Sequence, residues 1–93
     1  MRANQPMDDQ TTDAIADARR VLGRALRELR SQAGITQKEL ASRASADDTY
    51  VSQVETGHRD IRWSTITRLL IALDVSVGDL AAAIERQERT RQR

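Results

Sequence analysis

Residues 36–57, TQKELASRASADDTYVSQVETG, constrain the fold of this chain more than any other stretch. Thr36 is followed three residues later by Glu39, which is the spacing of a capping box at the start of a helix. The apolar residues of the next two turns share one helical face, and they are Leu40, Ala41 and Ala44. The pattern predicts a short helix over the first part of this stretch.

A corner and a second short helix follow in the same stretch. Residues 45–46 interrupt the apolar pattern, and Asp47 is a favourable N-cap for a new helix. That helix is expected over residues 48–55, with two valines pointing inward, and Gly57 suits the position just after its end. Two helices joined by a tight corner form a helix-turn-helix motif.

The composition excludes several other classes of protein. A chain of 93 residues predicts one small domain. The absence of cysteine excludes disulfides and thiolate metal sites. The chain has a single histidine, so a metal site built from several histidines is excluded as well. No apolar run approaches the roughly 20 residues needed to span a bilayer, and the N-terminus lacks the apolar segment of a signal peptide. We therefore expect a cytoplasmic protein without membrane contact.

The N-terminal part of the chain predicts an arm and a long helix. Residues 1–11 are polar, contain Pro6 and have no periodicity, so they are expected to form a disordered arm. A minor-groove arm is the less favoured alternative, because this region carries one arginine and several aspartates. The first helix is expected from Thr12 and ends at Gly34. Its apolar stripe consists of Ile15, Ala18, Leu22, Leu26, Leu29 and Ala33.

Two more helices are expected after the central stretch. The fourth runs from Trp63 to Leu73, and the fifth begins after Ser76, which forms a second capping box with Asp79. The inward residues of the two helices are Ile66, Leu69, Leu70, Leu73, Leu80, Ala83 and Ile84. The prediction is therefore an all-α, compact five-helix domain over residues 12–86, with a C-terminal tail, 87–93, that is helical and then frays.

The motif residues resemble those of the lambda-repressor/Cro-like helix-turn-helix family, also called the XRE family. The resemblance runs from about Leu22 to Leu80 and is carried by GITQ with ELA, by YVSQVE before Gly57, and by LDVS. It implies a lambda-repressor-like DNA-binding domain whose second motif helix, 48–55, enters the DNA major groove. Double-stranded DNA is then the expected partner, and no cofactor is implied.

The resemblance also implies roles for individual side chains. Gln37 would hydrogen-bond a phosphate at the start of the first motif helix, and Thr49, Ser52 and Gln53 would face the bases. Glutamine can pair bidentately with adenine. Each residue has a structural alternative, such as Ser52 bonding its own helix. The expected DNA-binding residues are Gln37, Arg43, Asp48, Thr49, Ser52, Gln53, His58, Arg59 and Arg62.

Three further residues of the motif, two acidic and one in the corner between the helices, need separate explanations. The resemblance implies a structural role for Glu55, paired with an arginine such as Arg30 or Arg59. Ser45 stands where the family usually has glycine, and it would cost about 1 kcal/mol if its backbone is left-handed. Asp48 either accepts from cytosine N4 or weakens DNA binding through repulsion of phosphate.

The charge and the apolar surface predict a homodimer. Residues 35–74 carry five basic and six acidic groups, so the motif region has a net charge of −1 and should bind non-specific DNA weakly. Trp63 and Ile71 are expected to be exposed, and exposed apolar side chains of this size indicate a partner surface. The expected interface between two copies consists of Trp63, Ile71 and Ile84 on the fourth and fifth helices.

The leading functional hypothesis is a sequence-specific transcriptional regulator, a dimeric repressor that binds a palindromic operator. The alternative is an antitoxin or adaptor that uses the same fold to bind another protein. An enzyme is not expected, because the chain has no cysteine, no glycine-rich phosphate loop and no paired-carboxylate pocket. The adjacent Asp47 and Asp48 cannot converge on one substrate from neighbouring helical positions.

Overall fold

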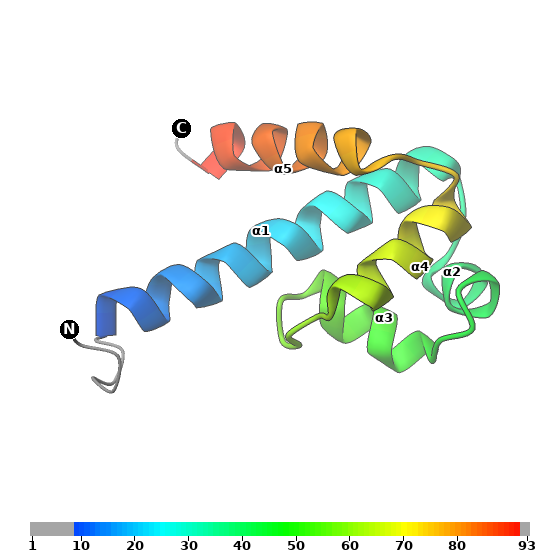
Figure 1. Cartoon of the computed structure of the whole chain (residues 1–93), viewed down its shortest axis with the longest axis horizontal. Helices are drawn as coiled ribbons and strands as arrows, with labels where there is room; N and C mark the ends of the chain where they lie inside the picture. Colours follow the sequence, from blue (N-terminus) through cyan, green and yellow to red (C-terminus); the bar gives the residue numbers. More distant parts are fainter. Residues whose placement is uncertain (1–8, 92–93) are drawn as a thin grey trace.

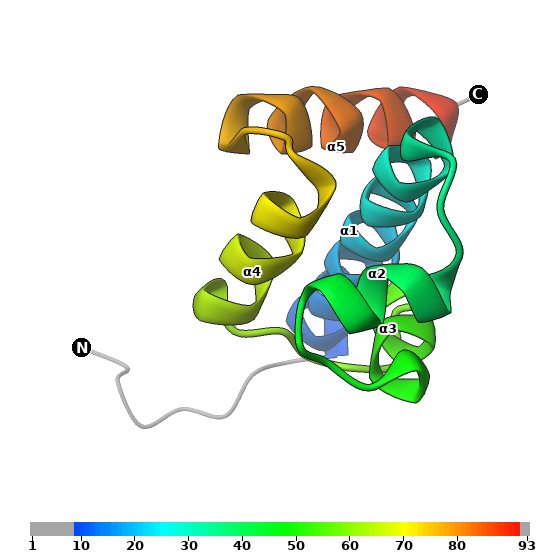
Figure 2. The same cartoon turned by 90° about the vertical axis from the view of Figure 1, so that its right-hand side faces the viewer.

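The computed structural model describes residues 9–91, which form five helices and no strand. Figure 1 shows α5 along one side of the molecule and the α2–α3 pair on the opposite side, with α1 and α4 between them. The view in Figure 2 gives the same layering. The all-α, five-helix prediction is confirmed. The helices are α1 (Asp9–Ala33), α2 (Gln37–Arg43), α3 (Asp48–Glu55), α4 (Trp63–Leu73) and α5 (Val77–Arg91).

The first helix begins earlier than the sequence predicts. Residues 9–11 belong to α1, whereas they were expected in the arm; the rest of that arm, 1–8, lies outside the described residues. Extending an existing helix by one residue costs little, and neither glycine nor proline occurs between Asp9 and Gly23. The acidic Asp9 also lies in the favourable first turn. At the other end, α5 continues to Arg91, and residues 92–93 lie outside the description.

The core is built around α1, which packs against α3, α4 and α5. Its buried arc is therefore wider than the predicted stripe: Val21 and Ala25 are buried, although the stripe omitted them. Ala18 and Ala33, which the stripe included, are exposed. The inward residues expected on the fourth and fifth helices are buried, apart from the half-buried Ile84. The largest fully buried side chains are Leu26, Leu40, Leu69 and Val51.

Side-chain caps fix where three of the helices start. The Glu39 N–H donates to Thr36 Oγ1 at 3.0 Å, and the Thr36 N–H donates to Glu39 Oε1 at 3.3 Å, which completes the predicted capping box. A matching box precedes α5, where the Asp79 N–H donates to Ser76 Oγ at 3.0 Å. Asp47 caps α3 by accepting from the Thr49 N–H at 2.7 Å, and this bond lowers the pKa of the Asp47 carboxyl.

Left-handed residues end α2 and α3. Ser45 has φ 54°, so the corner does require the conformation that costs serine about 1 kcal/mol relative to glycine. Gly57, with φ 80°, follows α3, and the next N–H, of His58, donates to the Gln53 carbonyl at 2.9 Å. This 6→1 bond is the Schellman motif, and it confirms the predicted glycine stop.

Gly23 allows α1 to lie directly against the C-terminal end of α3, a contact that the sequence did not predict. A Cβ atom at Gly23 would stand 2.6 Å from the Glu55 carbonyl oxygen and nearer still to that of Val54. Both obstacles are backbone atoms, so no side-chain rotation can relieve the clash. The helix pair can therefore approach this closely only because residue 23 has no side chain.

We predict that Gly23→Ala destabilises the protein by about 1–3 kcal/mol, the usual cost of overpacking. This change in stability is opposite in sign to the effect of helix propensity, which by itself favours alanine over glycine by about 1 kcal/mol. Gly78→Ala is the matched control, because a Cβ there meets only Ser76 Oγ at an ordinary 3.5 Å. Urea unfolding of the two variants measures the difference, and equal stabilities would show that the α1–α3 contact tolerates a methyl group.

Candidate nucleic-acid interface

Helix α3 has one buried face and one open face. Val51, Val54 and Glu55 are buried against the rest of the domain. On the other side Asp48 and Thr49 are exposed, and Ser52 and Gln53 are half-buried. Positions three and four apart adjoin on a helix surface, so these four polar side chains share one accessible face. The structure thus brings together the residues that the sequence predicted to face DNA bases.

Glu55 fixes α3 to its neighbours from the buried side. Only 5% of this residue is exposed. Arg30 Nε donates to Glu55 Oε2 at 2.6 Å, and Arg30 Nη2 donates to Glu55 Oε1 at 3.0 Å. These bonds raise the pKa of Arg30 above its usual value. The structural role expected for Glu55 is confirmed, with Arg30 rather than Arg59 as its partner.

Gln37 lies at the start of α2 and takes part in the same cluster. Its Nε2 donates to Glu55 Oε1 at 2.9 Å, a contact that the sequence did not predict. The amide NH₂ group has two donors, so one remains for a DNA phosphate. Contact between Gln37 and phosphate stays a prediction, and the structure adds a second role that holds α2 against α3.

Asp48 and Arg43 lie at the edges of the open face. Asp48 Oδ1 accepts from the Thr49 N–H at 3.0 Å, beside the Asp47 cap, so its carboxylate is partly engaged by its own helix. Arg43, in the last turn of α2, is exposed. A shallow hollow between α2 and α3 is lined by Lys38, Ser42, Asp47 and Asp48, among others. Positive and negative side chains therefore both lie along this edge.

The loop after α3 brings further polar groups to the same side. Arg59 Nε donates to Gln53 Oε1 at 3.2 Å, and the guanidinium carbon lies 4.9 Å from the centroid of the Tyr50 ring. His58 Nδ1 lies 2.8 Å from Thr56 Oγ1, so this ring nitrogen is engaged locally. Arg62 is exposed at the N-cap of α4 and makes no side-chain capping bond.

Arg68 and Thr65 are candidate contacts that the sequence did not suggest. Together with Arg59 and Arg62 they line a hollow of about 480 Å³ between α3 and α4. Residues 62, 65 and 68 follow one another at intervals of three, which places them on one side of α4. The spacing of Arg62 and Arg68 in the sequence could therefore have predicted that both arginines lie on one side of α4, beside the motif.

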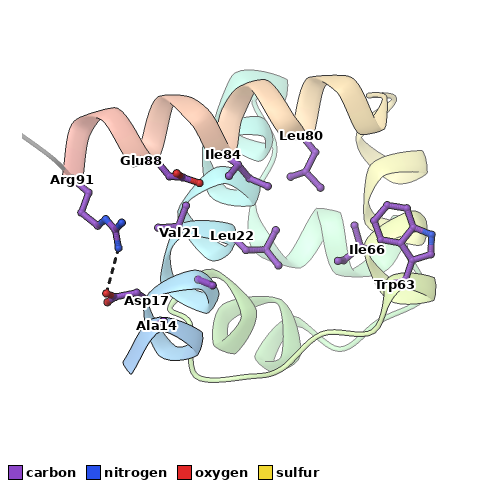
Figure 3. Close-up of a pocket in the computed structure, with 11 residues that line it drawn as sticks. Ala14, Asp17, Val21, Leu22, Trp63, Ile66, Leu80, Ile84, Glu88 and Arg91 are labelled. Atoms are coloured by element: carbon purple, nitrogen blue, oxygen red, sulfur yellow. Dashed lines mark ion pairs between the residues drawn. The ribbon is translucent and has the colours of Figure 1, made fainter. Parts of the chain in front are cut away.

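Two of the expected dimer residues, Trp63 and Ile71, lie on the other side of α4, and the third, Ile84, lies on α5. Trp63 is 61% exposed and Ile71 is 73% exposed, in agreement with the prediction. Val77, in the first turn of α5, is also 53% exposed, which the sequence did not predict. Trp63 and Ile84 line one groove of about 530 Å³ between α1, α4 and α5, as Figure 3 shows, whereas Ile71 lies outside it.

Over residues 9–91, no three His, Asp or Glu side chains gather closely enough to hold a metal ion. Within the same residues, no helix has the length and apolar character to cross a membrane.

Comparison with known proteins identifies the family. Residues 21–84 match the family model described as "Helix-turn-helix domain". The controller protein C.AhdI of a restriction-modification system from Aeromonas hydrophila is 38% identical, with a TM-score of 0.65, over 70% of this chain and 97% of that chain. The clp gene regulator ClgR from Corynebacterium glutamicum is 27% identical, with a TM-score of 0.72, over 92% and 97%. Among curated proteins, no sequence gives a significant match.

A third similar structure supports the fold alone. The restriction-modification controller protein C.Esp1396I, solved as a tetramer in complex with its natural 35 base-pair operator, is 21% identical, with a TM-score of 0.71, over 75% of this chain and 92% of that chain. The family match covers most of the five-helix unit, including the motif and the helices that support it. The chain therefore belongs to the helix-turn-helix family and is a DNA-binding transcription regulator of the lambda-repressor/Cro-like (XRE) type.

Proposed function

We propose that this regulator is a dimeric repressor that places α3 of each copy in the major groove of a palindromic operator. The observation that carries the proposal is the two-sided character of α3. Its inner face is fixed by Val51, Val54 and the Glu55 cluster, while its outer face keeps polar side chains accessible. A recognition helix needs this combination, because base contacts require a fixed orientation as well as free donors and acceptors.

The candidate contacts divide into two groups. Thr49, Ser52 and Gln53 would contact base edges from α3, and Asp48 would accept from a cytosine amino group. The phosphate contacts would come from the flanking elements, and we extend the sequence prediction with Arg68. This second group consists of Gln37, Arg43, His58, Arg59, Arg62 and Arg68.

A dimer compensates for the weak charge of a single copy. With a formal net charge of +1, one copy neutralises few phosphates in excess of its own acidic groups. Linking two recognition helices makes the second binding event intramolecular and raises the overall affinity. We propose that Trp63, Ile71 and Ile84, together with Val77, form the contact between copies. The protein would then act in the cytoplasm on DNA, with no cofactor, membrane contact or enzymatic activity.

The solved relatives support this proposal. C.AhdI is a controller protein, ClgR is a gene regulator, and C.Esp1396I binds its operator as a tetramer. An antitoxin or adaptor remains the alternative, because the apolar groove beside Trp63 could bind a different protein. The regulator is favoured, since a protein adaptor has no need for an accessible polar face on α3.

We predict that selection from random duplex DNA enriches a palindrome with half-sites about 34–36 Å apart, one helical turn. Gln53→Ala should lose discrimination at one base pair of each half-site, by about 1–3 kcal/mol, because one base contact is removed. Sequencing of the selected pools measures both effects. The absence of any enriched sequence at low salt would rule out the proposed function and favour the adaptor.

We also predict that Ile71→Glu weakens self-association by at least about tenfold, because it places a charge in an apolar contact. Trp63→Ala should act in the same direction. Ser42→Glu, an exposed position on α2, is the control and should leave association unchanged. Analytical ultracentrifugation without DNA provides the measurement. If both α4 variants associate as strongly as wild type, the interface between copies lies elsewhere on the domain.

A further inference from the structure

We propose, on the basis of the function proposed above, that Arg59 and Gln53 contact DNA as one unit and select guanine. The two side chains come from different elements, the loop after α3 and α3 itself. They are joined by the hydrogen bond from Arg59 Nε to Gln53 Oε1, 3.2 Å long. This differs from the simpler expectation that Gln53 pairs alone with adenine while Arg59 grips a phosphate.

Arg59 is held from two sides. Besides its bond to Gln53, its guanidinium lies over the ring of Tyr50, 4.9 Å from the centroid. Tyr50 is half-buried and packs against the core, so it offers a fixed surface. A guanidinium over an aromatic face is attracted by the electrons of the ring even at an exposed site. The backbone is also fixed, because the Schellman bond from His58 to Gln53 immediately precedes Arg59. These contacts make the Arg59–Gln53 arrangement a preformed feature of the domain.

The Arg59 bond changes which hydrogen-bonding groups Gln53 offers. A free glutamine amide offers one acceptor and one donor side, which matches the N7 acceptor and N6 donor of adenine. In this domain the amide oxygen already accepts from a cation, and such charge-assisted bonds are stronger than neutral ones. The groups that remain are mostly donors: the two N–H of Gln53 Nε2 and those on the two Nη atoms of Arg59.

A surface of donors matches guanine better than adenine. In the major groove guanine presents two acceptors, N7 and O6, whereas adenine presents one acceptor beside an amino group. The amino group of adenine would face mainly further donors, because the single lone pair left on Gln53 Oε1 is the one acceptor that this pair still offers. Arg59 is therefore a specificity-determining residue, acting both by its own N–H groups and by orienting Gln53.

Arg62 provides a matched comparison in the same loop. It is exposed like Arg59, but as the N-cap of α4 it makes no side-chain capping bond, and it does not stack on Tyr50. If it contacts DNA, it is expected to do so at phosphate, which changes affinity without changing base preference. The two arginines have the same charge, so a difference between their variants reports the contact with Gln53.

The test measures base preference in wild type, Arg59→Ala, Arg62→Ala and Gln53→Ala, by selection from random duplexes and then by competition among defined duplexes. Gln53→Ala identifies the base pair that depends on this side chain. We expect guanine there in wild type, and at least about a fivefold shift of the guanine-to-adenine ratio toward adenine in Arg59→Ala. Arg62→Ala should weaken binding to all sequences alike and keep the ratio.

Two results would overturn the inference while leaving the proposed function intact: adenine at this base pair in wild type, or an unchanged ratio in Arg59→Ala. The absence of any selected sequence for wild type would instead reject the proposed function, and this inference with it. Both arginines are exposed, and circular dichroism melts of the variants verify that the domain remains folded.

Discussion

The orientation of the motif depends on the hydrogen bonds that the buried carboxylate of Glu55 accepts. It accepts two hydrogen bonds from Arg30 and one from Gln37, while Arg30 Nη1 donates to the Ile35 carbonyl at 2.8 Å. One charged pair therefore joins α3 to α1, to α2 and to the connection between them. The side chains of Arg30 and Glu55 are only 13% and 2% exposed. Removing either one leaves the other as a poorly solvated charge, which is strongly destabilising.

The α1–α3 contact lies at the same end of α3. Gly23 allows the backbone of α1 to reach the last carbonyls of α3, and Glu55 projects from that last turn toward Arg30. Packing and charge thus fix the C-terminal end of α3, while the Asp47 cap fixes its start. A short helix of eight residues is marginal by itself. Its fixed position in this domain comes from these contacts at both ends.

The sequence predicted the local features of this fold well. Capping boxes at Thr36 and Ser76 and the stop at Gly57 depend on neighbouring residues, so their spacing was sufficient. The features that were missed depend on the tertiary arrangement. Nothing near Gly23 in the sequence indicates a carbonyl oxygen of α3 against its Cα, and nothing near Arg59 indicates its bond to Gln53. The resemblance implied an arginine as the partner of Glu55, with Arg30 and Arg59 as examples, and the structure identifies this partner as Arg30.

The Arg30–Glu55 pair holds the motif in place, and a double-mutant cycle tests this claim most directly. Urea unfolding of wild type, Arg30→Met, Glu55→Gln and the double variant gives the coupling free energy between the two side chains. The structure predicts that each single variant loses about 3 kcal/mol in free energy of unfolding. The loss in the double variant should be smaller than the sum of the two single losses by about 2 kcal/mol. Additive effects, within about 0.5 kcal/mol, would contradict the claim.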